Sequence, residues 1–145
     1  MSDRIRKLAE GFYVAPQIDA DDIADAAALG VRLVICNRPD GEEFGQPSAA
    51  DVEKAARAAG LAFAAIPVRM DAIEDAHVAR FAAAVESAGG PVLAYCRSGT
   101  RSTVLRALAR SQAGDPVDAI LAEAAALGYD LRALRPRLVA ANSER

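Results

Sequence analysis

Hydrophobic residues along the chain form two alternating patterns that predict different elements. Short runs that are almost wholly apolar are typical of strands buried on both faces of a sheet, and they cover residues 11–14, 31–36, 61–68 and 91–95. Ala-rich segments with apolar positions at helical spacing cover residues 19–29, 48–59, 75–88, 102–112 and 115–127, with a last helix from residue 130 interrupted near Pro136. This alternation predicts an α/β fold, a mainly parallel sheet of four to five strands flanked by helices.

Length and charge limit the organisation and the class of partner. The chain has 145 residues, and no Pro-, Gly- or Ser-rich linker, low-complexity tract or repeat divides it. A core of this size folds without disulfides or metals, so we predict a single domain over residues 1–145. Lys and Arg number 17 and Asp and Glu 20, which gives a net charge of −3. Such a balance offers no general positive field for nucleic acid or an anionic membrane surface.

The sequence predicts a cytoplasmic protein. The longest apolar run, residues 61–68, contains Pro67 and is far too short for a membrane span. The N-terminus is polar and lacks the apolar stretch of a secretory signal. Two cysteines, Cys36 and Cys96, are too few for a disulfide scaffold, and a reducing compartment keeps them as thiols.

The segment that carries the candidate chemistry begins at Cys96, directly after the predicted strand 91–95. Ligands of open α/β sheets bind at the carboxyl ends of the strands. The loop turns at Gly99, and its successive N–H groups and the N-terminus of the next helix favour an anion. Arg101 adds a planar fork that holds two oxygens at once. We therefore predict an anion-binding loop and a Cys96 thiolate nucleophile; the loop residues are Arg97, Ser98, Gly99, Thr100, Arg101 and Ser102. The plain alternative is that Cys96 is one more small buried residue.

These segments resemble a known family. The motifs GFYVAPQ, VRLVICNRPDGEE, QPS, AIPV, GPVLAYCRSGTRS and GYDL are similar to a bacterial family called the phosphatase-like domain of beta-lactamase-hydrolase-like proteins, also described as a sulfurtransferase family. The resemblance implies a fold like that of dual-specificity cysteine phosphatases. Some members are fused to a metal-dependent dioxygenase that oxidises persulfides, so a persulfide dioxygenase is a candidate partner. The loop CRSGTRS alone is also similar to that of rhodanese domains.

Two departures from the cysteine-phosphatase pattern make sulfur transfer the favoured hypothesis. Four residues separate Cys96 from Arg101 where the phosphatase motif has five, and Tyr95 stands where that motif has His. A shorter loop has one N–H donor fewer for a phosphoryl group. In sulfur transfer, the Cys96 thiolate takes sulfane sulfur from thiosulfate or a persulfide and passes it to a thiol acceptor. The alternative is a phosphatase that acts on a phosphate ester through a phosphocysteine, and the third hypothesis is a non-catalytic module that binds an anion or persulfide.

Asp71 is the best candidate for the general acid that a phosphatase needs, because it follows the strand that ends at the same edge of the sheet. Glu74 is the second candidate. Either carboxylate equally suits the N-terminus of the helix that begins near residue 75. We expect no cofactor and no metal site, because His77 is the single histidine and has no second ligand at metal spacing.

Two residues at the end of the strand 31–36 have two explanations each. Arg38 can reach the bound anion, as the resemblance suggests, or pair with Asp40 or Glu42 within a turn. Cys36 lies at a strand end beside the predicted site and is a candidate resolving thiol, although burial in the core is the commoner role of such a cysteine.

Overall fold

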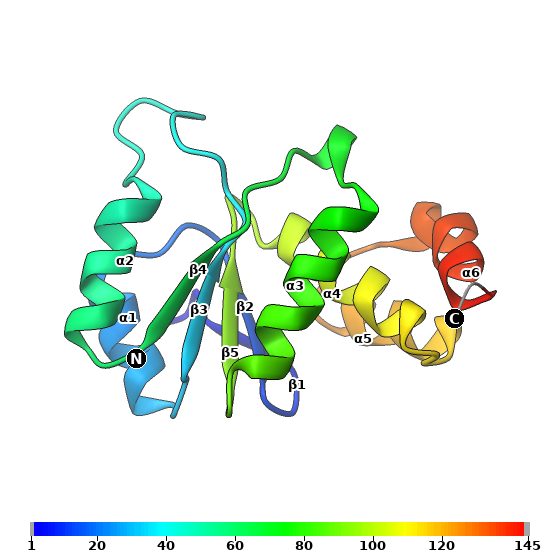
Figure 1. Cartoon of the computed structure of the whole chain (residues 1–145), viewed down its shortest axis with the longest axis horizontal. Coiled ribbons are helices and arrows are strands. Elements are labelled where there is room, and N and C mark those ends of the chain that lie inside the picture. Colours follow the sequence, from blue (N-terminus) through cyan, green and yellow to red (C-terminus); the bar gives the residue numbers. More distant parts are fainter. Residues whose placement is uncertain (1, 144–145) are drawn as a thin grey trace.

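The computed structural model describes residues 2–143, which form a five-stranded sheet with helices on both faces (Figure 1). The strands are β1 (Arg6–Ala9), β2 (Phe12–Ala15), β3 (Leu33–Cys36), β4 (Ala62–Ala65) and β5 (Val92–Tyr95). Their order across the sheet is β1-β2-β5-β3-β4. The four strands β2 to β5 run parallel, and β1 pairs antiparallel with β2. The predicted fold class is confirmed.

The helices divide between the two faces of the sheet. They are α1 (Ala20–Ala28), α2 (Ala49–Ala58), α3 (Asp75–Ser87), α4 (Thr100–Gln112), α5 (Val117–Ala126) and α6 (Arg135–Ser143), with 3₁₀ turns η1 (Met70–Ala72) and η2 (Arg132–Leu134). Figure 1 shows α1 and α2 on one side of the sheet and α3 and α4 on the other. Helices α5 and α6 pack against α4 farther from the sheet.

Alternation along the buried strands supplies a core to each face of the sheet. Leu33 and Ile35 of β3 join the cluster under α3 and α4, whereas Val34 and Cys36 join the cluster under α1 and α2. Because both faces are covered, β3 and β5 are buried along their whole length. The carboxyl ends of these central strands are therefore held by packing on both sides.

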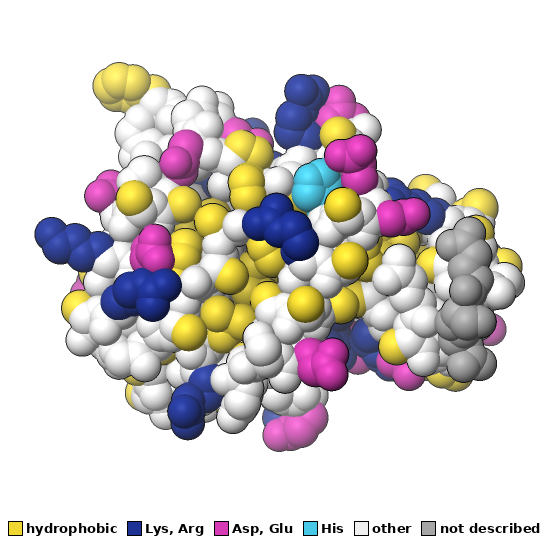
Figure 2. Space-filling model, in the orientation of Figure 1, with side chains coloured by type: hydrophobic (Ala, Val, Ile, Leu, Met, Phe, Trp, Pro, Cys, Tyr) yellow, Lys and Arg dark blue, Asp and Glu magenta, His cyan; other side chains and the backbone are white. Residues whose placement is uncertain are grey.

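Strands β1 and β4 and helix α4 are among the elements that differ from the prediction. Strand β1 was not expected, because its sequence RKLA is half exposed and has no continuous apolar run. Strand β4 covers only Ala62–Ala65 of the predicted run 61–68. As an edge strand it is partly exposed, and hydrophobic side chains gather on the surface between α2 and α3 (Figure 2). Helix α4 begins at Thr100, two residues before the predicted start, so the loop after β5 is shorter than expected.

Within residues 2–143, none of the helices combines the length and the apolar character that crossing a membrane requires.

Candidate active site

Cys96 follows β5 directly, at the carboxyl edge of the sheet, and its sulfur lies at the N-terminus of α4. The backbone N–H of Gly99 donates a hydrogen bond to Cys96 Sγ over 3.1 Å. Gly99 is the N-cap of α4 and has a φ of 90°, a left-handed conformation that glycine adopts without strain. The turn thus directs a backbone donor and the positive end of a helix at the sulfur. Both place positive electrostatic potential beside the sulfur.

The guanidinium group of Arg101 lies at the same edge of the sheet, and a carboxylate of the protein itself is bound to it. Its two terminal nitrogens donate to the two carboxylate oxygens of Glu42, each over 2.8 Å. One of them also donates to the carbonyl of Val68 over 3.0 Å. The hydrogen bonds from Arg101 hold the pKa of Glu42 down at about 2. Arg101 therefore binds the carboxylate of Glu42 in the bidentate geometry that the sequence predicts for an oxyanion.

Arg38 is buried in this site and makes the pair with Glu42 that one of its two explanations predicts; its contact with a bound anion stays a prediction. Its side chain is 3% exposed, and its Nε donates to Glu42 over 2.9 Å. Its terminal nitrogens donate to Glu43 over 2.7 Å and to Gln17 over 3.1 Å. Arg38 and Arg101 thus share the carboxylate of Glu42, and Arg38 also pairs with Glu43 of its own turn. The predicted alternative partner, Asp40, instead accepts the backbone N–H of Ala49.

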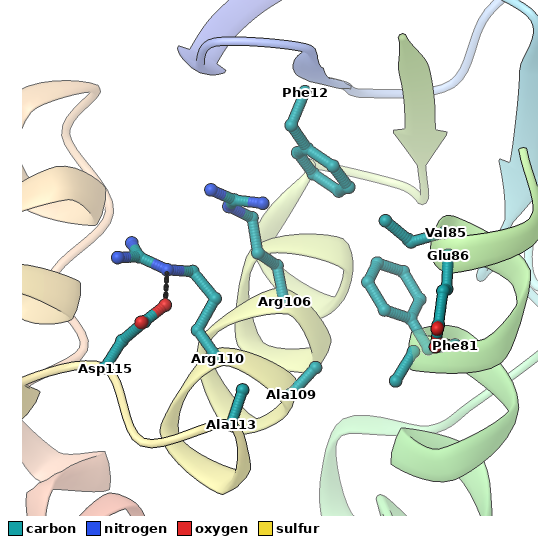
Figure 3. A pocket seen from close by; sticks show the side chains of 10 residues that line it. Phe12, Phe81, Val85, Glu86, Arg106, Ala109, Arg110, Ala113 and Asp115 are labelled. Carbon is teal, nitrogen blue, oxygen red and sulfur yellow. Dashed lines mark hydrogen bonds and ion pairs between the residues drawn. The ribbon is translucent and has the colours of Figure 1, made fainter. Parts of the chain in front are cut away.

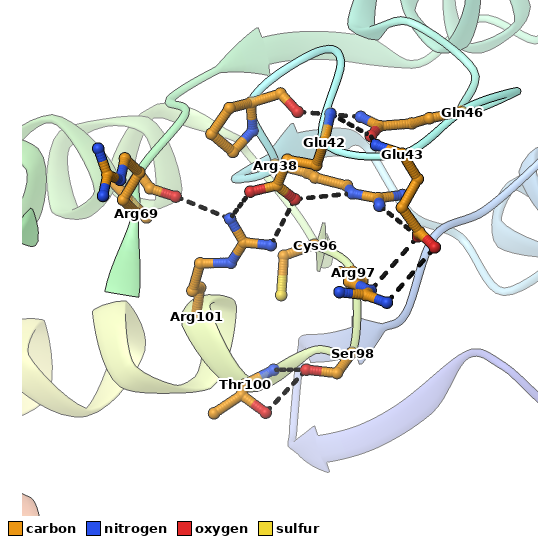
Figure 4. Close-up of polar contacts among 12 residues, drawn as sticks. Arg38, Glu42, Glu43, Gln46, Arg69, Cys96, Arg97, Ser98, Thr100 and Arg101 are labelled. Carbon is orange, nitrogen blue, oxygen red and sulfur yellow. Dashed lines mark hydrogen bonds and ion pairs between the residues drawn. The ribbon is translucent and has the colours of Figure 1, made fainter. Parts of the chain in front are cut away.

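The segment that supplies Glu42 lies beside the cysteine. Residues 38–46, here called the 38–46 loop, follow β3. They are tied to residues 96–102, here called the Cys96 loop, by the ion pairs of Glu42 with Arg101 and of Glu43 with Arg97. Figure 4 shows the Glu42 carboxylate between the guanidinium groups of Arg101 and Arg38, with Cys96 beside them. Cys96 is 0% exposed. The site lies at the predicted edge of the sheet, but it is closed rather than open to solvent.

The hydroxyls of the Cys96 loop have other partners than a bound anion. Ser98 and Thr100 hydrogen-bond to each other over 2.9 Å on the exposed side of the turn. Ser102, fully buried, donates to the side-chain oxygen of Asn37 over 2.8 Å. Asn37 thus accepts the hydroxyl proton of Ser102, and the place of Ser102 in the anion-binding loop stays a prediction. Ser102 instead connects α4 to the end of β3.

The two candidate acids lie apart from the cysteine. Asp71 is in η1, with its side chain 68% exposed, and it pairs with Arg69 over 2.9 Å. Glu74 is the N-cap of α3, and its backbone N–H donates to His77 Nδ1 over 2.9 Å. Neither carboxylate hydrogen-bonds to the Cys96 loop within the residues that the structure describes. A role for Asp71 as the acid stays a prediction.

Cys36 is a free, buried thiol beside the site. Its sulfur donates to the carbonyl of Arg38 over 3.4 Å, and burial raises the pKa of the thiol. Its register partner on β5 is Tyr95, the residue before Cys96. Burial likewise raises the pKa of Tyr95, so this phenol stays neutral beside the site. A resolving role for Cys36 stays a prediction.

Sequence reasoning missed four residues that shape the site. Glu42 was considered only as a turn partner of Arg38, and Glu43 was assigned no role, although both lie in the turn that follows the strand 31–36. Gln46 accepts the backbone N–H groups of both glutamates over 3.0 and 3.2 Å. The hydroxyl of Tyr129, from the GYDL motif, donates to the carbonyl of Ser98 over 3.0 Å. The only available signal was the position of these residues in motifs of the family.

We expect Gly99→Ala to lower the free energy of unfolding by about 1–2 kcal/mol, because an L-residue is strained at this φ. A Cβ there would also overlap the Tyr129 hydroxyl. Urea denaturation measures the change. Gly60→Ala is the matched control, since Gly60 has a φ of 84° and open space around it. If the two variants lose equal stability, the overlap between the added Cβ and the Tyr129 hydroxyl does not contribute to the loss.

A separate hollow lies between α3 and α4, away from the cysteine (Figure 3). It measures about 270 Å³, and Phe12 and Phe81 line it. Two arginines at its rim are already paired: Arg106 with Glu123, and Arg110 with both Glu123 and Asp115. The hollow therefore lacks the free cationic groups of an anion site.

Comparison with known proteins shows the family of the chain. Residues 4–115 match the family described as beta-lactamase hydrolase-like protein, phosphatase-like domain. The chain belongs to this family. It is 37% identical over 132 residues to a beta-lactamase hydrolase-like protein of Xylella fastidiosa. The matched segment covers 88% of this chain and 30% of that protein. This phosphatase-like domain thus spans about 30% of the length of that relative.

Solved structures confirm that the fold of the phosphatase-like domain is that of cysteine phosphatases. A crystal structure from Neisseria meningitidis, described as a candidate phosphatase, has a TM-score of 0.87 and 40% identity, over 97% of this chain and 99% of that one. The TpbA protein of P. aeruginosa, crystallised with pTyr, has a TM-score of 0.59 and 21% identity, over 93% and 90% of the two chains. The second likeness concerns the fold alone.

Proposed function

We propose that the protein is a cysteine-dependent phosphatase that acts through a phosphocysteine on Cys96. The observation that carries the proposal is the bidentate grip of Arg101 on a carboxylate beside a sulfur that accepts a backbone N–H. A phosphate group offers oxygens at similar spacing to such a fork. The family and the phosphatase-like neighbours favour this alternative over the sulfur transfer that the loop length suggested.

The reaction would proceed in two displacements. The Cys96 thiolate forms a bond to phosphorus while the bond from phosphorus to the ester oxygen breaks, and that oxygen leaves with the electron pair. Water then attacks the phosphocysteine, the bond between sulfur and phosphorus breaks, and inorganic phosphate and the thiolate are released. Arg101 and Arg38 stabilise the negative charge on the transferred oxygens. The leaving oxygen needs a proton unless it is already a stable anion.

Sulfur transfer is the second candidate, favoured by one observation on the Cys96 loop. Only four residues separate Cys96 from Arg101, and of their N–H groups that of Gly99 is directed at the sulfur. A single sulfur atom on Cys96 needs fewer donors than a phosphoryl group with three oxygens. The compound that gives up the sulfur atom releases a stable anion as its leaving group, so this reaction needs no general acid.

Intact mass and turnover together distinguish the candidates. The protein is incubated with p-nitrophenyl phosphate, with thiosulfate and with glutathione persulfide. We expect release of p-nitrophenolate and a phosphoryl adduct on Cys96. One added sulfur on Cys96, with no phosphate release, would replace the phosphatase proposal by sulfur transfer. Binding of phosphate without turnover or adduct would instead indicate a non-catalytic anion-binding module.

If Asp71 supplies the proton to the leaving oxygen, Asp71→Asn should slow hydrolysis of an alkyl phosphate by about 10²-fold. Hydrolysis of p-nitrophenyl phosphate should change little, because p-nitrophenolate leaves without a proton. Steady-state rates on the two esters measure the difference. Asp75→Asn is the control, since Asp75 is an exposed carboxylate at the start of α3. Equal loss on both esters, or no loss on the alkyl ester, would remove Asp71 from the reaction.

A further inference from the structure

We propose that Glu42 is a specificity-determining residue whose carboxylate occupies the place of the substrate's anionic group, so that an anionic substrate must displace it to reach Cys96. The identity of that group as a phosphate rests on the proposed function. The occupation of the Arg101 fork rests on contacts alone.

The carboxylate of Glu42 is held as a bound oxyanion would be. Three N–H donors converge on its two oxygens: both terminal nitrogens of Arg101 and the Nε of Arg38, all within 2.9 Å. Both arginines are almost fully buried, with 8% and 3% of their surface exposed. Buried guanidinium groups need a counter-charge, and Glu42 supplies it where the site would otherwise take one from the substrate.

The 38–46 loop is built to keep Glu42 there. The side-chain oxygen of Gln46 accepts the backbone N–H groups of Glu42 and Glu43, and its amide nitrogen donates to the carbonyl of Pro39 over 2.9 Å. Gln46 thus closes the loop on itself. Because Arg101 and Arg38 hold the pKa of Glu42 at about 2, the carboxylate stays charged at neutral pH. Release therefore depends on competition by another anion.

The balance of charge around the cysteine determines which anions can take the place of Glu42. Three cations, Arg38, Arg97 and Arg101, face two carboxylates, Glu42 and Glu43. Adding a dianion while Glu42 remains would leave more negative than positive charge around the two buried arginines, Arg38 and Arg101, which is unfavourable. When Glu42 leaves, the same dianion replaces its contacts. The exchange selects anions that can offer two oxygens to Arg101.

The test compares wild type with Glu42→Gln, using inorganic phosphate as the probe. We expect calorimetric titration to give at least about tenfold tighter phosphate binding in the variant. A factor of this size corresponds to the loss of one charged group that competes with phosphate for the same hydrogen bonds. Alkylation of Cys96, mapped by mass spectrometry, is the second readout. Its rate with anionic iodoacetate, relative to neutral iodoacetamide, should rise by a similar factor.

Glu53→Gln is the matched control, because it removes one carboxylate from α2, far from the cysteine in sequence, that pairs with the exposed Arg57. It should bind phosphate as wild type does. If Glu42→Gln does not fold, Glu42→Asp keeps the charge but shortens its reach, and tighter binding is again expected. Equal or weaker phosphate binding in the folded variant would overturn the assignment of Glu42. Tighter binding without hydrolysis of any phosphate ester would support it while the proposed phosphatase function fails.

Discussion

Cys96→Ser should reduce turnover of p-nitrophenyl phosphate by at least about 10⁴-fold, because the nucleophile of a covalent mechanism cannot be replaced by a hydroxyl without an adjacent base. No histidine is available to activate a serine there: His77, the single histidine of the chain, caps α3 through its Nδ1. The phosphoryl adduct should disappear together with turnover. Initial rates and intact mass on the same samples measure both.

Cys36→Ala controls for the loss of a thiol. Cys36 lies on the face of the sheet covered by α1 and α2, and its sulfur donates to the carbonyl of Arg38. This variant should keep turnover and the adduct on Cys96. Turnover that survives in Cys96→Ser, or that is lost equally in Cys36→Ala, would contradict the assignment of Cys96 as the nucleophile.

Arg101→Lys should lower kcat/KM for p-nitrophenyl phosphate by about 10²- to 10³-fold, the effect of removing one preorganised donor to a developing oxyanion. An ammonium group keeps the charge but cannot hold two oxygens in one plane. The variant also loses part of the grip on Glu42 and on the Val68 carbonyl. Thermal unfolding, measured beside the kinetics, separates a loss of fold from a loss of catalysis.

Arg57→Lys is the matched control for the charge-conserving change. Arg57 lies on α2, and its ion pair with Glu53 is exposed to solvent, where such pairs contribute little. The control should leave kcat/KM unchanged. A folded Arg101→Lys protein with activity within about threefold of wild type would show that bidentate contact is not part of the reaction.

The elements that the sequence predicted well are those whose signal is local. The run VRLVIC is apolar at nearly every position because β3 is covered on both faces, and the position of Cys96 follows from the run before it. The left-handed turn at Gly99 and the fork of Arg101 also lie within a few residues of Cys96. Strand β1 was missed because its pairing with β2 at the edge leaves no apolar period to detect.

The closed state of the site could not be predicted, because it depends on contacts between distant parts of the chain. Glu42 and Arg101 are 59 residues apart in sequence, and a Glu-Glu pair in a turn has the same composition as an ordinary solvated loop. Asp71 shows the opposite case. It follows a strand that ends at the correct edge, yet the turn η1 directs it to Arg69 and to solvent.

The tether between Glu42 and the sheet makes the 38–46 loop an internal ligand with an effective concentration. For a group on a short linker this concentration is on the order of millimolar or higher, so a substrate at lower concentration meets a site that is mostly filled. The apparent affinity for substrate then equals the intrinsic affinity multiplied by the fraction of molecules in which Glu42 has left Arg101. A change at Gln46 or Pro39 that loosens the loop would alter KM without touching a reacting atom. The measured KM of this protein would thus report a conformational equilibrium as well as the fit of the substrate.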